Sequence, residues 1–198
     1  VILSLLLVIA VGSALAQEPG VIPPHREQVS HAAGAQPRYI YWTDSQEDVI
    51  YRGQADGSSY KALLTERDPG LFSTRDSVLF WVDRLSNTIN RTVIGKPAAD
   101  PLVAAENVHG LELTGGGEML YWSTVDDSVT YVHRLKLSDD TRDTVLSVVQ
   151  QGMGFEVDGQ AEEIYWIQDG SIRRAPLTDG DAQVLVEDLT SPAGLTHD

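Results

Sequence analysis

Tyr41-Trp42-Thr43-Asp44 is the first of four similar tetrapeptides, each with an aromatic residue directly before a tryptophan. The other three are Phe80-Trp81-Val82-Asp83, Tyr121-Trp122-Ser123-Thr124 and Tyr165-Trp166-Ile167-Gln168. They contain every tryptophan of the chain, at successive spacings of 39, 41 and 44 residues. A period of about 40 residues indicates repeated supersecondary units.

A second marker recurs in step with the tryptophans, namely a glycine followed by a large apolar residue. Its four occurrences are Gly70-Leu71, Gly110-Leu111, Gly154-Phe155 and Gly194-Leu195. The first three glycines precede the aromatic residue of their pair by 10, 11 and 11 residues. Two markers in constant phase strengthen the case for a repeat.

Each unit is predicted to contain four short strands. The first follows the glycine, as in residues 111–114 and 155–158, and the second carries the aromatic-tryptophan pair. The third runs through residues 128–133 or 171–174, and the fourth is a β-branched run such as 183–186. Because no helical period follows residue 16, we expect an all-β protein.

Turn residues lie between the third and fourth strands of each unit. They are Asp56-Gly57, Gly95-Lys96, Asp139-Asp140 and Asp179-Gly180. Asp-Gly supplies the positive φ angles of a tight hairpin. Gly115-Gly116-Gly117 is also predicted to form a turn.

The paired aromatic residues favour a β-propeller. Adjacent residues of a strand point to opposite faces of a sheet, so both faces must be covered to bury both rings. Stacked blades provide that cover. We therefore assign a structural packing role to Tyr41, Trp42, Phe80, Trp81, Tyr121, Trp122, Tyr165 and Trp166.

The motif at residues 41–44, the turn Asp56-Gly57-Ser58 and the segment Pro192-Ala193-Gly194-Leu195 resemble LDL-receptor class B repeats, also called YWTD repeats. The resemblance covers residues 38–198 and implies blades of a six-bladed propeller. In that family the motif threonine and aspartate tie strands and blades together, a role that carries over to Thr43, Asp44 and Asp83. Thr124 and Gln168 replace the aspartate in the third and fourth units.

The number of units leaves two interpretations open. Six blades of this length need about 245 residues, whereas this chain supplies about four four-stranded blades. Either two blades are missing from the sequence, or residues 194–198 close a four-bladed ring. We expect the first, so that 38–198 is an incomplete propeller.

The N-terminal region predicts export. Residues 1–16 form an apolar run that ends in Ala14-Leu15-Ala16, as a signal peptide does before its cleavage site. Residues 17–37 contain prolines and glycines without a hydrophobic period and are predicted to be a linker. We expect a secreted, extracellular or periplasmic protein whose mature chain does not insert into a membrane.

Composition excludes several kinds of partner and site. With 29 acidic and 14 basic residues, the net charge of −15 disfavours nucleic acids and anionic membranes. An acidic surface suits a basic protein partner or calcium. The absence of cysteine excludes disulfides and thiolate sites.

Motifs of catalytic chemistry are missing, and no catalytic or cofactor-binding residue is predicted. The five histidines form neither an HxH nor an HExxH pattern. Glu112 and Glu156 occupy the same place in successive units, so they are candidate metal ligands facing a central channel. Calcium bound there would indicate a hydrolase similar to the gluconolactonases, but the equivalent positions Phe72 and Thr196 are not acidic.

The leading hypothesis is a non-enzymatic scaffold that binds a protein ligand through its loops. His109 and Arg84 are candidate loop residues. Asn90-Arg91-Thr92 fits an N-glycosylation acceptor, which applies only to a eukaryotic source. The sequence does not identify the ligand.

Overall fold

The computed structural model describes residues 38–65, 68–96, 100–149, 154–178 and 180–196. The predicted signal peptide and linker lie outside these residues. The described elements are strands, apart from one short 3-10 turn, η1 (Gly115–Gly117). No helix in the described part of the chain is long and apolar enough to cross a membrane. The prediction of an all-β protein is confirmed.

The strands form four antiparallel sheets within the described residues. The first sheet contains β1 (Tyr39–Asp44), β2 (Val49–Gln54) and β3 (Tyr60–Leu64). The second contains β4 (Pro69–Arg75), β5 (Val78–Asp83), β6 (Thr88–Val93) and β7 (Asp100–Ala104). The third contains β8 (Val108–Thr114), β9 (Met119–Asp126), β10 (Val129–Lys136) and β11 (Thr141–Val149). The fourth contains β12 (Phe155–Asp158), β13 (Glu163–Gln168), β14 (Ser171–Pro176) and β15 (Gln183–Val186).

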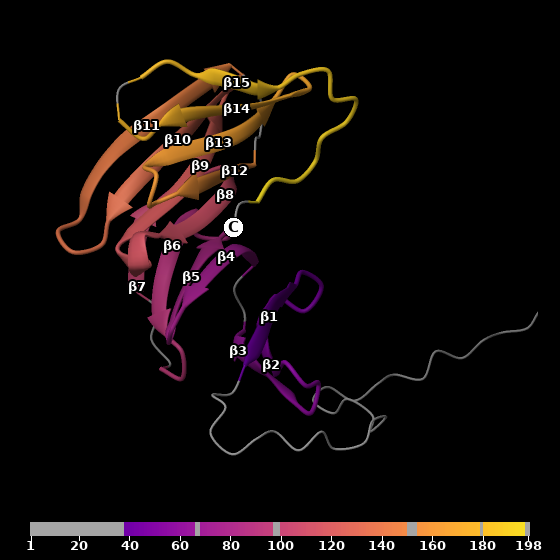
Figure 1. The fold of residues 1–198 in the computed structure, drawn as a ribbon. Helices are drawn as coiled ribbons and strands as arrows, with labels where there is room; N and C mark the ends of the chain where they lie inside the picture. The colour runs from indigo at the N-terminus through magenta and orange to yellow at the C-terminus, as the bar shows by residue number, and fades with distance from the viewer. Residues whose placement is uncertain (1–37, 66–67, 97–99, 150–153, 179, 197–198) are drawn as a thin grey trace, which may run out of the picture. The chain divides into compact units, whose positions relative to one another are not determined.

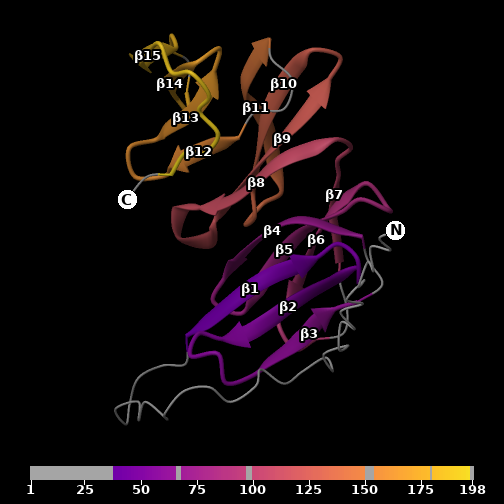
Figure 2. The same ribbon diagram turned by 90° about the vertical axis from the view of Figure 1, so that its right-hand side faces the viewer.

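The second, third and fourth sheets follow the predicted four-strand plan, with strands paired in chain order. Figure 2 shows them as separate sheets. The first sheet departs from the prediction because it has three strands in the described part of the chain. The reason lies in the sequence, where no glycine-apolar marker precedes Tyr39.

The chain divides into two units, of which the smaller comprises residues 38–40 and 52–61 of the described part. Within this unit the Arg52 guanidinium lies over the Tyr39 ring, 4.3 Å from its centroid. The predicted Asp56-Gly57 turn closes a hairpin, with Gly57 at a φ of 76° and a hydrogen bond of 2.9 Å from the Gln54 amide to the Ser59 carbonyl. Glycine suits this position because it adopts positive φ without strain.

A tight turn also follows the strand that carries the aromatic-tryptophan pair in each sheet, namely β1, β5, β9 and β13. Each of these turns places an aspartate or asparagine at positive φ: Asp48 (54°), Asn87 (52°), Asp127 (52°) and Asp169 (50°). Short polar side chains tolerate this left-handed region better than other non-glycine residues. The recurring acids and amides of these loops therefore serve the backbone first.

The core of the larger unit, residues 41–51 and 62–196 of the described part, lies between successive sheets. Phe80 of β5 packs with Trp122 of β9 in one cluster, and Tyr121 of β9 packs with Trp166 of β13 in another. The neighbouring residues Tyr121 and Trp122 thus face different sheets, as the period of two along a strand requires. Strands can carry two adjacent aromatic residues here because both faces of the third sheet are covered.

The inner strands β4, β8 and β12 bring the sheets together, since β8 contacts both β4 and β12. The glycine marker lies within β4 and β8, at Gly70 and Gly110, and directly before β12, at Gly154. The second, third and fourth sheets each extend away from their inner strand through three further strands (Figure 1). Radial sheets that begin on adjacent inner strands are the arrangement of propeller blades.

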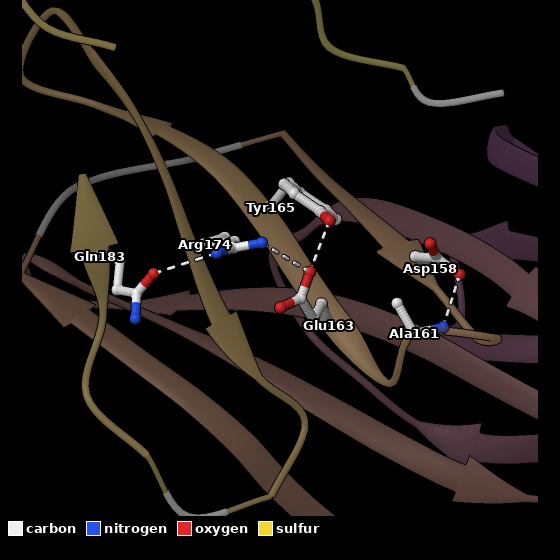
Figure 3. A network of polar contacts seen from close by, with 6 residues as sticks. All are labelled: Asp158, Ala161, Glu163, Tyr165, Arg174 and Gln183. Atoms are coloured by element: carbon white, nitrogen blue, oxygen red, sulfur yellow. Dashed lines mark hydrogen bonds and ion pairs between the residues drawn. The ribbon is translucent and has the colours of Figure 1, made fainter. Parts of the chain in front are cut away.

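The fourth sheet carries a polar network on the face opposite its buried residues. The Glu163 carboxylate accepts hydrogen bonds from the Tyr165 hydroxyl at 2.6 Å and from the Arg174 guanidinium at 3.2 Å (Figure 3). Arg174 also donates to the Gln183 side chain at 3.1 Å. The network crosses β13, β14 and β15, so it reinforces the pairing of the three strands.

Candidate functional site

The two candidate metal ligands lie on the inner strands of adjacent sheets. Glu112 is on β8 and Glu156 is on β12, and both are half-buried. The Glu112 carboxylate accepts a hydrogen bond of 2.9 Å from the backbone amide of Val157, across from one sheet to the next. Glu112 is therefore a tie between the third and fourth sheets, which the sequence did not predict.

Burial gives Glu112 an unusual protonation state. It raises the pKa of this carboxyl group from 4.5 to about 8, with a further rise from the negative charge of Glu156. The Val157 amide opposes the rise because it stabilises the charged form. At neutral pH Glu112 is thus mostly protonated, and the two acids do not both carry a full charge.

The acid pair provides few ligands for calcium. No group of three or more acidic or histidine side chains that could hold a metal ion occurs in the described residues. Calcium takes 6–8 oxygen ligands, so other blades would have to contribute. The equivalent positions Phe72 and Thr196 supply no carboxylate.

The motif aspartates act locally through the bonds seen here. Asp44 accepts hydrogen bonds from the backbone amides of Gln46 at 2.9 Å and Glu47 at 3.1 Å. Asp83, which is 1% exposed, accepts one from the Ser86 amide at 3.0 Å. These bonds fix the turn after the strand.

The units without the aspartate use different contacts at the same place. The Thr124 hydroxyl bonds to His133, and the Gln168 side chain accepts a hydrogen bond of 3.2 Å from the indole of Trp166. Thr43 is half-buried on β1. The fourth motif position thus serves either its turn or its own sheet.

The motif rings differ in burial from unit to unit. Trp81, Trp166, Phe80, Tyr121 and Trp122 are between 0% and 5% exposed. Trp42 is only half-buried and stacks on Tyr51, with ring centroids 5.4 Å apart. Tyr41 and Tyr165 are half-buried as well.

The candidate glycosylation site lies inside the fold. Asn90 is on β6 and is 5% exposed. Its side-chain nitrogen, to which a glycan would be attached, donates a hydrogen bond of 2.9 Å to the Thr88 hydroxyl. The folded structure therefore does not favour Asn90 as an acceptor.

A cleft of about 690 Å³ opens beside the third sheet. One wall is the end of β7 and the segment that follows it, residues 103–107, and the other is the face of β9, β10 and β11. The lining includes Trp122, Thr124 and His133 together with the charged residues Glu106, Asp126, Arg142 and Asp143.

His133 forms the centre of the cleft floor. One ring nitrogen, Nε2, lies 2.9 Å from the Thr124 hydroxyl, and the other, Nδ1, lies 3.1 Å from the Thr144 hydroxyl. The ring packs against Trp122 at a centroid distance of 5.2 Å. Burial lowers the pKa of His133 below its usual value, so the imidazole is neutral at pH 7.

The cleft was not predicted from the sequence. Thr124 and His133 lie in the segments predicted as the second and third strands of one unit, and these strands were correctly predicted. The opposite wall, residues 103–107, comes from the end of the preceding unit, so the sequence does not show that the two walls meet. The loop candidates lie elsewhere: His109 is exposed on β8, and Arg84 forms an exposed ion pair of 3.6 Å with Asp68. Neither lines the cleft.

The comparisons with known proteins agree with the arrangement of the sheets. A family model of the low-density lipoprotein receptor repeat class B matches residues 38–71. A chain in the crystal structure of a nidogen/laminin complex is similar, with 17% identity and a TM-score of 0.67; the match covers 76% of this chain and 61% of that one.

Two bacterial structures share the fold as well. A gluconolactonase from Xanthomonas campestris is 15% identical with a TM-score of 0.60, covering 75% of this chain and 58% of the other. TolB from Acinetobacter baumannii is 12% identical with a TM-score of 0.58, covering 74% and 40%. This chain spans less than two thirds of each of these proteins. The sheets described here thus have a β-propeller fold, and residues 38–71 match the model of the low-density lipoprotein receptor class B repeat.

Proposed function

We propose that this chain belongs to an exported, non-enzymatic propeller that binds a protein ligand. The class B repeat at residues 38–71 carries the proposal. The fold shared with a chain of the nidogen/laminin complex supports it, because that structure contains a protein-protein assembly. The use of Glu112 as a tie between sheets also supports a structural role for the inner acids.

A binding panel tests this function. The purified full chain is immobilised, and purified extracellular protein domains of basic and acidic charge are passed over it. We expect at least one basic domain to bind saturably, with an association rate that falls as salt rises, because the net charge of −15 attracts such a partner over about 10 Å. Failure of every domain to bind would contradict the proposal.

Export forms a separate part of the proposal. The apolar run at residues 1–16 supports cleavage after Ala16. Expression in a secreting host, followed by mass spectrometry of the released protein, should give an N-terminus at Gln17. Retention of the whole chain inside the cell would contradict export while leaving the binding function open.

The acid pair favours one alternative, a calcium-dependent hydrolase similar to the gluconolactonase. The raised pKa of Glu112 is of the kind that a general acid requires. A lactone hydrolysis assay with and without calcium tests this alternative. Calcium-dependent turnover that is lost in Glu156→Gln but kept in Glu118→Gln would support the hydrolase; Glu118 is an exposed acid outside the pair. We expect no turnover.

A further inference from the structure

In the described residues, the outer strands of the second and third sheets differ in length beside the cleft. β10 has 8 residues and β11 has 9, whereas β6 has 6 and β7 has 5. Each residue adds about 3.3 Å to a strand, so the outer strands of the third sheet are longer than those of the second by roughly 7–13 Å. The cleft floor lies on these longer strands, since His133 of β10 and Arg142, Asp143 and Thr144 of β11 line it.

The charges of the cleft are separated along this floor. Asp126 pairs with Val129 at one end of β10, and Arg142 pairs with Leu135 towards the other end. Val129 and Leu135 are six residues apart on one strand, a distance of about 20 Å. Glu106, on the opposite wall, lies in the short segment between the end of β7 at Ala104 and the start of β8 at Val108.

The charged groups at the two ends are available to a ligand. Glu106, Asp126 and Arg142 are exposed, and none of them forms an ion pair with another described residue. Asp143 differs from them, because the Arg134 guanidinium binds it through two hydrogen bonds. One end of the cleft is thus acidic, and the other carries a free cation.

The middle of the floor offers hydrogen bonds rather than charge. A neutral imidazole has one donor and one acceptor nitrogen, so of Thr124 and Thr144 one hydroxyl donates to the His133 ring and the other accepts. Each hydroxyl keeps further capacity for a hydrogen bond. Peptide groups of an extended chain, which present a donor and an acceptor at every residue, match such a surface.

We propose that this cleft binds an extended protein segment that carries a basic side chain at one end and an acidic side chain about six residues away. The basic side chain lies between Glu106 and Asp126, the acidic one pairs with Arg142, and the peptide backbone passes Thr124 and Thr144. This inference rests on the proposed protein-binding function and gives it a site and a class of ligand.

Peptide selection tests the charge pattern. A phage library of random nonapeptides is panned against the immobilised full chain. We expect enriched sequences to contain a lysine or arginine and, about six positions away, an aspartate or glutamate. Panning against Arg142→Glu should replace the enriched acid with a base. A fluorescein-labelled enriched peptide should bind Arg142→Glu and the double variant Glu106→Gln/Asp126→Asn at least tenfold more weakly.

Matched variants separate the cleft from general charge effects. Lys61→Glu and Glu187→Gln change exposed charges outside the cleft and should leave the peptide Kd unchanged. Arg142→Gln provides a milder change, which should remove the acidic preference without introducing a repulsive charge. Melting curves of all variants should coincide, because the substituted side chains are exposed.

Three results would overturn the inference: no enriched peptides, enriched peptides without the paired charges, or a charge pattern unaffected by Arg142→Glu. A protein domain that binds in the panel described above distinguishes failure of this inference from failure of the proposed protein-binding function. If that partner binds the cleft variants with unchanged Kd, the cleft is not the site although the protein-binding function stands. If neither partner nor peptide binds, both proposals fail.

Discussion

Glu112 is the residue whose surroundings change its chemistry most. Its side chain is half-buried in the folded protein, interacts with the negative charge of Glu156 and accepts one backbone hydrogen bond from the next sheet. Burial and like charge outweigh the single hydrogen bond, so the protonated form is favoured in the folded state. The protein therefore binds a proton at Glu112 that the unfolded chain releases above pH 4.5.

This linkage predicts that stability falls with rising pH. The contribution of Glu112 is fully present below pH 4.5 and is lost as the pH rises through about 8. Between pH 7 and 8.5 the free energy of unfolding should fall by about 1 kcal/mol, after allowance for partial exposure. Glu112→Gln, which keeps an acceptor for the Val157 amide, should flatten this slope in urea melts.

Protonation of His133 sets the lower pH limit of that measurement, because this group also contributes to the pH dependence of stability at acidic pH. Burial lowers its pKa, so His133 contributes stability above pH 6.5 that is lost on acidification, the opposite sign from Glu112. Above pH 7 this contribution changes little, because the imidazole of the unfolded chain is already mostly neutral there. Glu118→Gln, at an exposed acid, should keep the wild-type slope. An equal slope in Glu112→Gln would show that Glu112 is not the titrating group.

At the scale of elements, the glycine marker has different roles in two sheets. A side chain at Gly110 of β8 would lie 2.6 Å from the Phe155 ring and 2.9 Å from the Ser123 hydroxyl. At Gly154, directly before β12, a side chain would meet nothing within 4 Å. The same sequence marker therefore permits close packing at one blade and imposes no contact at the next.

Alanine substitutions distinguish the two glycines. Gly110→Ala should lower the free energy of unfolding by about 1–3 kcal/mol, because the new methyl group overlaps a ring and a buried hydroxyl. Gly154→Ala should change it by less than about 0.5 kcal/mol, since neither space nor a positive φ opposes it. Chemical denaturation of both variants provides the comparison. Equal losses would contradict the role given to Gly110.

The strands should also differ from one another in local stability. β5 is buried along nearly its whole length, whereas every residue of β15 is exposed. Terminal strands have one row of unpaired backbone groups and few apolar contacts. In hydrogen-exchange mass spectrometry the amides of β15 should therefore exchange before those of β5, β9 and β13. Protection of β15 equal to that of β5 would contradict this order.

At the scale of the whole molecule, four equivalent tryptophans have unequal surroundings. Trp81 and Trp166 are 0% and 1% exposed, whereas Trp42 is half-buried. Replacement of Trp81 or Trp166 by alanine should cost about 3–5 kcal/mol, the range for large buried rings. Trp42→Ala should cost less than either. Thermal and urea denaturation of the three variants would check the order, and an equal loss for Trp42 would contradict it.

Much of the fold could be predicted because the repeat stands in the sequence itself. The aromatic-tryptophan pairs lie on β1, β5, β9 and β13, the second strands of the predicted units. The fourth strand predicted at residues 183–186 is β15. The first sheet was predicted less well, because its marker glycine is missing. A recurring arginine opposite the motif aromatic residue, as in Tyr121–Arg134 and Tyr165–Arg174, was also missed.

The all-β class, the order of strands along each repeat and the pairs of rings that need cover on two faces could be inferred from the amino-acid sequence. These features depend on local alternation, turn residues and a period along the chain, all of which one sequence displays. The folded structure was needed to show that Glu112 reaches the Val157 amide, that Asn90 is buried and that His133 lies in a cleft. Such properties depend on which surfaces contact each other and on how far one sheet extends past another. Neither can be read from the order of residues along the chain.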